Sequence, residues 1–139
     1  MKMLVAYFSA GGVTARVAKR LAAVSEKMRV FCLEKGVRAR EAMLVSLCTE
    51  EIAMNILAHG FTADRRKHTL EIRTVHKGDR LTLHFRDNSV LFDPTKYAAL
   101  HRSGGPDHIG LRMVMRMVGE AVYVNSLGLN NLFFTVRVS

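Results

Sequence analysis

The sequence predicts a two-layer α/β sandwich of the α+β class, in which a mixed, mostly antiparallel sheet is covered on one face by helices. Three observations support this fold. Two long stretches repeat their apolar residues every three or four positions, as amphipathic helices do. Two pairs of short segments are each joined by a glycine-bearing turn, as in antiparallel hairpins. The length of 139 residues fits a single domain spanning residues 1–139.

The first half of the chain predicts one strand followed by two helices. Residues 3–9 are rich in β-branched and aromatic side chains, which favours a strand. Residues 13–35 carry an apolar helical repeat that ends at Gly36, and residues 38–59 carry a second repeat that ends at Gly60. Glycine is the usual residue just beyond the C-terminus of a helix, so both boundaries are well marked.

The second half of the chain begins with a predicted hairpin. Residues 69–76 and 80–86 alternate apolar and polar side chains on either side of the turn Lys77-Gly78-Asp79. A period of two places the apolar side chains of each segment on one face of a strand. The short turn makes the two strands antiparallel neighbours.

A polar stretch, a third helix and a last hairpin complete the predicted order. Residues 95–106 are polar and contain glycines, which predicts a mobile segment. Residues 109–118 predict a helix that begins near a glycine. Residues 121–125 and 131–138 predict a hairpin that turns at Gly128.

The chain is strongly basic. Its net charge of +9 at pH 7 comes from 21 Lys and Arg residues against 12 Asp and Glu residues. These basic residues are scattered, and no set of aromatic residues is interleaved with them for stacking on bases. The pattern argues against a nucleic-acid partner and favours attraction to an acidic protein or a polyphosphate.

Two further features indicate a cytoplasmic protein. No apolar run approaches the roughly 20 residues that a helix needs to cross a bilayer, so we expect no membrane span. Cys32 and Cys48 both lie inside apolar helical patterns. We therefore expect buried free thiols in a reducing compartment.

A polar stripe runs along the second predicted helix. Glu51, Asn55 and His59 follow one another at steps of four in "EEIAMNILAHGF". Residues at this spacing lie one above another on a helix. An amide oxygen can fill one vertex of an octahedral Mg²⁺, and a carboxylate can accept a proton. The stripe therefore has the chemistry of a metal-assisted site, although Glu51 and Asn55 could also form a structural network.

Two later motifs add a base reader and a phosphate cradle. Asp87 stands just beyond a predicted strand in "RDNSVLFDP", where it could also be a simple turn residue. A carboxylate accepts hydrogen bonds without donating them, which suits the exocyclic amino group of adenine. In "HIGLRMV", Gly110 opens a helix whose free N–H groups suit phosphate.

Taken together, these three motifs resemble the ATP-binding (Bergerat) fold shared by gyrase, histidine kinases and related ATPases. The closest likeness is to the small bacterial anti-sigma factor serine/threonine kinases, and it covers roughly residues 24–138. The resemblance implies that Glu51 is the catalytic base and Asn55 the Mg²⁺ ligand, while Asp87 reads adenine. The nucleotide-binding residues that it implies are Asn55, His59, Asp87, Ser89, His108, Gly110 and Leu111.

Three positions depart from the pattern of this family. Ser89 stands where the adenine motif usually has glycine, and His108 stands where the phosphate lid usually has glycine. A threonine common on the late strand is replaced near Asn131. Ser89 leaves Asp87 able to read adenine, whereas His108 predicts slow turnover.

The resemblance implies a regulatory function with ATP and Mg²⁺ as cofactors. The protein would hold a sigma factor or an anti-anti-sigma factor, act as a homodimer, and phosphorylate a Ser or Thr of its partner. An alternative is a degenerate module that senses nucleotide or binds a partner without phosphoryl transfer.

A third hypothesis comes from the N-terminus. The stretch "LVAYFSAGGVTARVAKRLA" resembles the loop that holds the FMN phosphate in flavodoxins, and it would make residues 1–22 an atypical N-terminal segment. A flavodoxin also needs a repeated βαβ order and aromatic flavin-stacking loops. The rest of the chain has neither, so an FMN binder ranks third.

Overall fold

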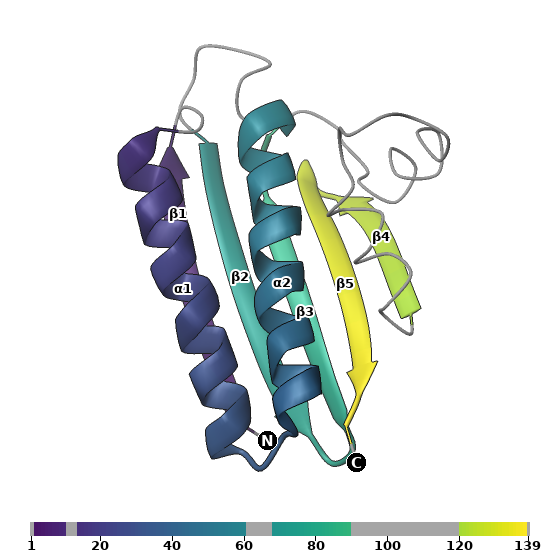
Figure 1. The fold of residues 1–139 in the computed structure, drawn as a ribbon. Coiled ribbons are helices and arrows are strands. Elements are labelled where there is room, and N and C mark those ends of the chain that lie inside the picture. Colours follow the sequence, from purple (N-terminus) through teal and green to yellow (C-terminus); the bar gives the residue numbers. More distant parts are fainter. Residues whose placement is uncertain (1, 11–13, 61–67, 90–119, 139) are drawn as a thin grey trace, which may run out of the picture.

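The computed structural model describes residues 2–10, 14–60, 68–89 and 120–138. Two helices form one layer and a five-stranded sheet forms the other (Figure 1), which confirms the predicted two-layer sandwich. In chain order the elements are β1 (Lys2–Ala10), α1 (Ala15–Glu34), α2 (Ala39–Asn55), the π-helical turn η1 (Ile56–Gly60), β2 (His68–Lys77), β3 (Arg80–Asp87), β4 (Glu120–Ser126) and β5 (Leu129–Arg137).

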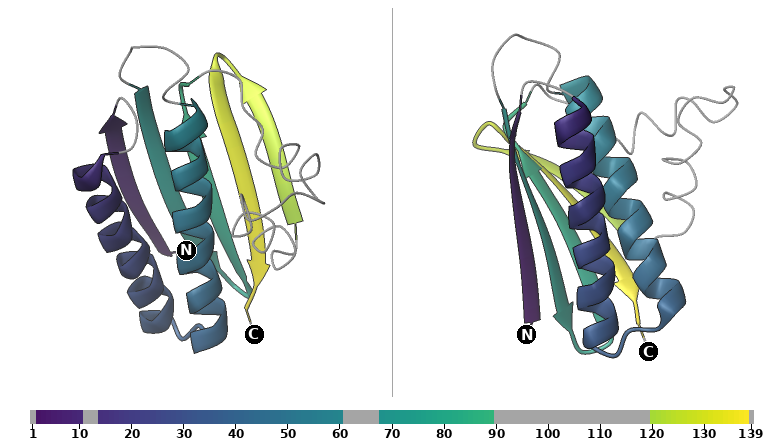
Figure 2. Two further views of the ribbon diagram at one scale, coloured as in Figure 1. Left: turned by 45° about the horizontal axis from the view of Figure 1, so that its top comes forward. Right: turned by 60° about the vertical axis from the view of Figure 1, so that its left-hand side comes forward.

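The sheet has the strand order β1-β2-β3-β5-β4, and all four pairings between these strands are antiparallel. The sheet was predicted to be mixed and mostly antiparallel, and its described strands are antiparallel throughout. Strand β1 pairs with β2 along its whole length, so the N-terminal segment is part of the sheet. A flavodoxin-like core would need parallel strands, and the described strands contain no parallel pair. Both helices lie on the same face of the sheet (Figure 2).

The helix boundaries follow the predicted signals with one difference. Helix α1 begins after Thr14, whose side chain accepts a hydrogen bond from the N–H of Val17 at 3.2 Å, as a helix cap does. It ends before Gly36, whose φ of +80° suits glycine. The predicted helix 38–59 is not α-helical to its end, because η1 begins at residue 56. A π turn is wider than an α turn, so the four-residue stripe does not continue unchanged beyond Asn55.

The hydrophobic core lies between the helices and the sheet. Its largest fully buried side chains are Phe8, Leu21, Met28, Ile52, Leu57, Leu70, Ile72, Leu81, Leu83, Phe85 and Phe134. Both cysteines are free and buried here, as expected, and burial raises the pKa of the Cys32 thiol to about 11. None of the described helices is long and apolar enough to cross a membrane.

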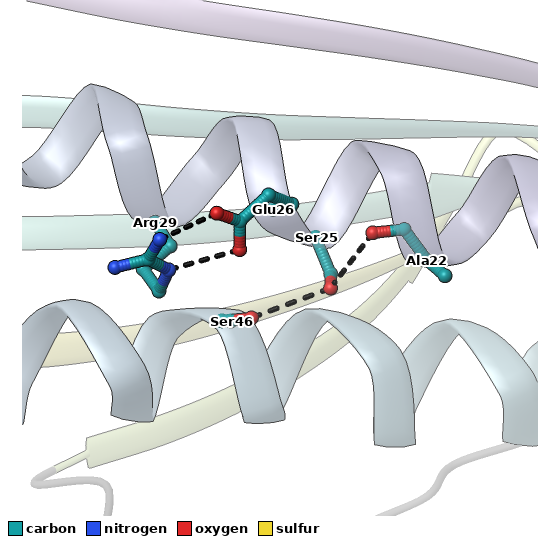
Figure 3. A network of polar contacts seen from close by, with 5 residues as sticks. All are labelled: Ala22, Ser25, Glu26, Arg29 and Ser46. Carbon is teal, nitrogen blue, oxygen red and sulfur yellow. Dashed lines mark hydrogen bonds and ion pairs between the residues drawn. The ribbon is translucent and has the colours of Figure 1, made fainter.

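A small polar contact joins the two helices across their interface (Figure 3). The hydroxyl of Ser46 on α2 donates to the hydroxyl of Ser25 on α1 at 3.3 Å, and Ser25 donates to the carbonyl of Ala22 at 3.3 Å. These small side chains let the helices approach closely while their hydroxyls stay paired. The nearby Arg29–Glu26 ion pair is exposed and adds little stability.

The face of the sheet turned away from the helices carries charged and aromatic side chains. Glu71 on β2 accepts hydrogen bonds from Arg73 at 2.6 Å and from Arg86 at 2.9 Å. His84 on β3 stacks on Phe133 of β5, with ring centroids 4.2 Å apart and ring planes 11° apart. Half-burial against these neighbours shapes the titration of His84.

The pKa of His84 is lowered chiefly by burial. The positive charges of Arg73 and Arg86 lower it further, whereas the hydrogen bond to Asn131 and the charge of Glu71 oppose the shift. The unfolded chain therefore binds a proton at a higher pH than the folded protein. This part of the stability is complete above about pH 6.5 and is lost as the pH falls from there towards the lower folded pKa.

We expect His84→Gln to remove this part of the acid sensitivity. Glutamine keeps a polar side chain beside Asn131 but has no proton to gain in this range. Lowering the pH from about 7.5 to about 5 should destabilise the wild type more than the variant, as measured by thermal unfolding at both pH values. Equal losses in the two proteins would show that His84 does not titrate as described.

Candidate functional site

The ends of several elements meet at one end of the sandwich. Helix α2 and strands β3 and β4 finish there, and β2 and β5 begin there (Figure 1). The antiparallel register sets Asp87, at the end of β3, directly across from Asn130, near the start of β5. Asn130 in turn lies across from Asn125 of β4. Polar residues from three neighbouring strands are thus gathered in one place.

Asp87 is the centre of this polar group. It is only 4% exposed, and its Oδ1 accepts three hydrogen bonds. The donors are the backbone N–H of Ser89 at 3.0 Å, the Ser89 hydroxyl at 2.5 Å and the Asn130 side-chain amide at 3.0 Å. No described residue donates to Oδ2. The carboxylate therefore keeps one oxygen as an acceptor for another molecule.

Ser89 lies directly beside Asp87 in the structure. The resemblance counts it among the nucleotide-binding residues. In the structure it is buried, and its N–H and hydroxyl both turn onto Asp87. Such a side-chain bond to the backbone two residues on is typical of an Asx turn. Ser89 thus holds the carboxylate in place from the β3 side.

Asn130 is the residue of the site that sequence reasoning missed. The resemblance points to Asn131, where a family threonine is replaced, but the side chain of Asn131 lies on the opposite face and pairs with His84 at 2.9 Å. Asn130 is 2% exposed and contacts Asp87. The signal was present in the alternation of β5, because Leu132 and Phe134 face the core and a period of two adds Asn130 to the same face.

Asn55, at the end of α2, has an amide oxygen without a partner. The side chain is 8% exposed, and its NH₂ group donates to the backbone carbonyl of Glu51 at 2.8 Å. Its Oδ1 is buried and accepts no hydrogen bond. A buried acceptor left unpaired is costly, and a divalent cation would satisfy it. Asn55 therefore fits one vertex of a Mg²⁺ site.

The rest of such a metal shell would have to come from outside the protein side chains described. Within residues 2–10, 14–60, 68–89 and 120–138, no group of three His, Cys, Asp or Glu residues could hold a metal ion. Mg²⁺ commonly keeps several waters and is held by one or two protein ligands together with substrate phosphates. Asn55 fits that arrangement rather than a cage built only of protein ligands.

Glu51 lies one helical turn before Asn55 and is half-buried. Burial raises the pKa of its carboxyl group, and the negative charge of Glu50 raises it further. A carboxylate with a raised pKa is a stronger base at neutral pH. The direction of this shift suits the role of proton acceptor.

The remaining predicted site residues lie outside the described part of the chain. His108, Gly110 and Leu111 fall there, together with the predicted mobile segment 95–106 and the predicted helix 109–118. For His59 the structure describes the backbone, in η1, and not the side chain. Their predicted roles stay predictions.

The sequence matches no family model and no curated protein. The likeness to the ATP-binding family therefore rests on the three motifs in the sequence. The geometry around Asp87 and Asn55 is an observation independent of that likeness.

Proposed function

We propose that this protein is an ATP-binding regulatory protein of the anti-sigma factor kinase type. It binds Mg-ATP at the end of the sandwich where α2, β3 and β5 meet. It holds a protein partner in the cytoplasm, a sigma factor or an anti-anti-sigma factor, and transfers the γ-phosphate to a Ser or Thr of the latter. The basic charge of the chain suits an acidic partner surface and a polyphosphate.

The observation that supports this proposal best is the state of the Asp87 carboxylate. One oxygen is saturated by three donors from the protein, and the other is left to accept. Adenine offers an amino group as a donor at its 6-position, whereas guanine offers a carbonyl acceptor there. A buried carboxylate with one free acceptor therefore favours the adenine nucleotide.

Asn55 and Glu51 supply the remaining chemistry of the proposed reaction. Asn55 would hold Mg²⁺ through Oδ1, and the ion would neutralise charge on the phosphates. Glu51 would accept the proton of the attacking hydroxyl group, which its raised pKa favours. The two side chains do not compete, because Asn55 bonds to the backbone carbonyl of Glu51 and not to its carboxylate.

The Asn55→Ala variant tests the metal part of this proposal. We expect it to lose most of the gain in ATP affinity that Mg²⁺ gives the wild type, while metal-free ATP binds about equally to both proteins. The helix should survive, because alanine is the best helix former. Calorimetric titration with ATP, with and without Mg²⁺, measures both affinities.

A matched control for this variant is Met43→Ala, an exposed position in the first half of α2. It should leave the effect of Mg²⁺ unchanged. A wild type that binds ATP equally well with and without Mg²⁺ would contradict the role of Asn55. A wild type that binds no ATP under either condition would contradict the proposed function itself.

A further inference from the structure

Asn130 is held from the edge of the sheet by two donors of β4. The hydroxyl of Tyr123 donates to its Oδ1 at 2.5 Å, and the side-chain NH₂ of Asn125 donates to the same oxygen at 3.0 Å. Both residues belong to the edge strand that pairs with β5. The oxygen half of the Asn130 amide is therefore directed towards β4.

The nitrogen half of the same amide must then face β3. It donates to Oδ1 of Asp87 at 3.0 Å and to the carbonyl of Ser89 at 3.4 Å. An ionised carboxylate only accepts hydrogen bonds, so a reversed amide would set two acceptors against each other. The contacts on both sides agree on one orientation, which makes the network internally consistent.

We infer that Asn130 is a positioning residue that sets the base specificity of the site. By holding Oδ1 of Asp87, together with Ser89, it leaves Oδ2 as the one acceptor offered to a ligand. The ligand class that this geometry selects is a nucleotide whose base carries an amino group at the reading position, against one that carries a carbonyl group there. This inference rests on the proposed function and adds a residue to it.

The first test compares two neighbouring asparagines on opposite faces of β5. Asn130→Ala frees Oδ1 of Asp87, so the carboxylate can rotate and the base contact loses its fixed geometry. We expect ATP affinity to fall roughly 5- to 150-fold and the preference for ATP over GTP to narrow. Asn131→Ala removes the contact with His84 on the far face and a hydrogen bond to the carbonyl of Leu129, but no contact with Asp87, so it should leave both quantities unchanged.

The second test uses pH and does not depend on nucleotide. Asn130→Asp brings a second carboxyl group within hydrogen-bond distance of Asp87, and two carboxylates that share a site raise one pKa strongly. The folded state then binds a proton more tightly than the unfolded chain, so stability rises as the pH falls through that raised pKa. The shared proton also restores a donor to Oδ1 of Asp87.

We therefore expect the melting temperature of Asn130→Asp, relative to that of the wild type, to rise as the pH is lowered from about 8 to about 5.5. Its ATP affinity should recover over the same range. The matched control is Asn131→Asp in the His84→Gln background, compared with His84→Gln alone, because the imidazole of His84 would otherwise pair with the new carboxylate. It should show neither effect. If the difference in melting temperature between Asn130→Asp and the wild type does not change with pH, the contact between residues 130 and 87 is wrong. This result does not depend on whether Asn130→Ala folds.

The outcomes separate the inference from the proposed function. If the wild type binds ATP and Asn130→Ala binds it as tightly, with the same preference over GTP, the inference fails and the proposed function stands. If the wild type binds neither nucleotide, both fail, even where the pH series shows that Asn130 and Asp87 are in contact. A drop in ATP affinity in the Asn130 variants and not in the Asn131 variants, with recovery of affinity at lower pH in Asn130→Asp, supports both.

Discussion

Asp87→Asn is expected to weaken ATP binding roughly 5- to 150-fold without unfolding the protein. The reason is that the two carboxylate oxygens have different partners, because Oδ1 accepts from the protein and Oδ2 is offered to the base. The three donors from Ser89 and Asn130 require an acceptor at the Oδ1 position, so the amide oxygen of the new side chain takes that place. The NH₂ group must then stand where Oδ2 was, and it would face the amino group of adenine, donor against donor.

The measurement is a titration of wild type and variant with ATP and with GTP, followed by thermal shift and by calorimetry. Asp79→Asn is a matched control, because it makes the same chemical change at an exposed residue in the β2–β3 turn. It should bind ATP as the wild type does. Equal stabilisation of the wild type by ATP and GTP would contradict the assignment of Asp87 as the residue that recognises adenine.

Much of the fold could be predicted because its signals are local. The alternation of apolar and polar residues in β2 and β3 indicates which side chains face the core. Gly78, with a φ of +61°, occupies the turn between the two strands. The glycine at position 36 marks the end of α1. Each signal needs only a few neighbouring residues, so one sequence is enough to read it.

The site could be predicted only in part, because its contacts join distant parts of the chain. Asp87 and Asn130 are brought together by the pairing of β3 with β5, and the sequence alone does not reveal that β5 rather than β4 lies next to β3. The alternation of β5 places Asn130 on the core face, but only the pairing of β5 with β3 shows that it meets Asp87. The π turn after Asn55 was also missed, since the apolar periodicity of residues 38–59 gives no sign of a change in helix geometry.

Glu51→Gln is expected to reduce phosphoryl transfer roughly 10²- to 10⁴-fold while leaving Mg-ATP affinity nearly unchanged. Glutamine keeps the size of the side chain but cannot accept a proton at neutral pH. The Asn55 contact should persist, because it uses the backbone carbonyl of Glu51. The assay is phosphorylation of a co-purified protein partner by labelled ATP, with nucleotide affinity measured on the same preparations.

Glu50→Gln separates the base from its neighbour and tests the cause of the pKa shift. Burial raises the pKa of Glu51 first and the charge of Glu50 raises it further, so removing that charge should lower the pKa. The rate of the wild type should fall as the pH drops through the raised pKa, because Glu51 must be ionised to act as a base. In Glu50→Gln this fall should move to lower pH, with the rate at neutral pH retained.

If the wild type binds Mg-ATP but neither hydrolyses it nor phosphorylates its partner, the kinase hypothesis is wrong, and a nucleotide sensor without phosphoryl transfer replaces it.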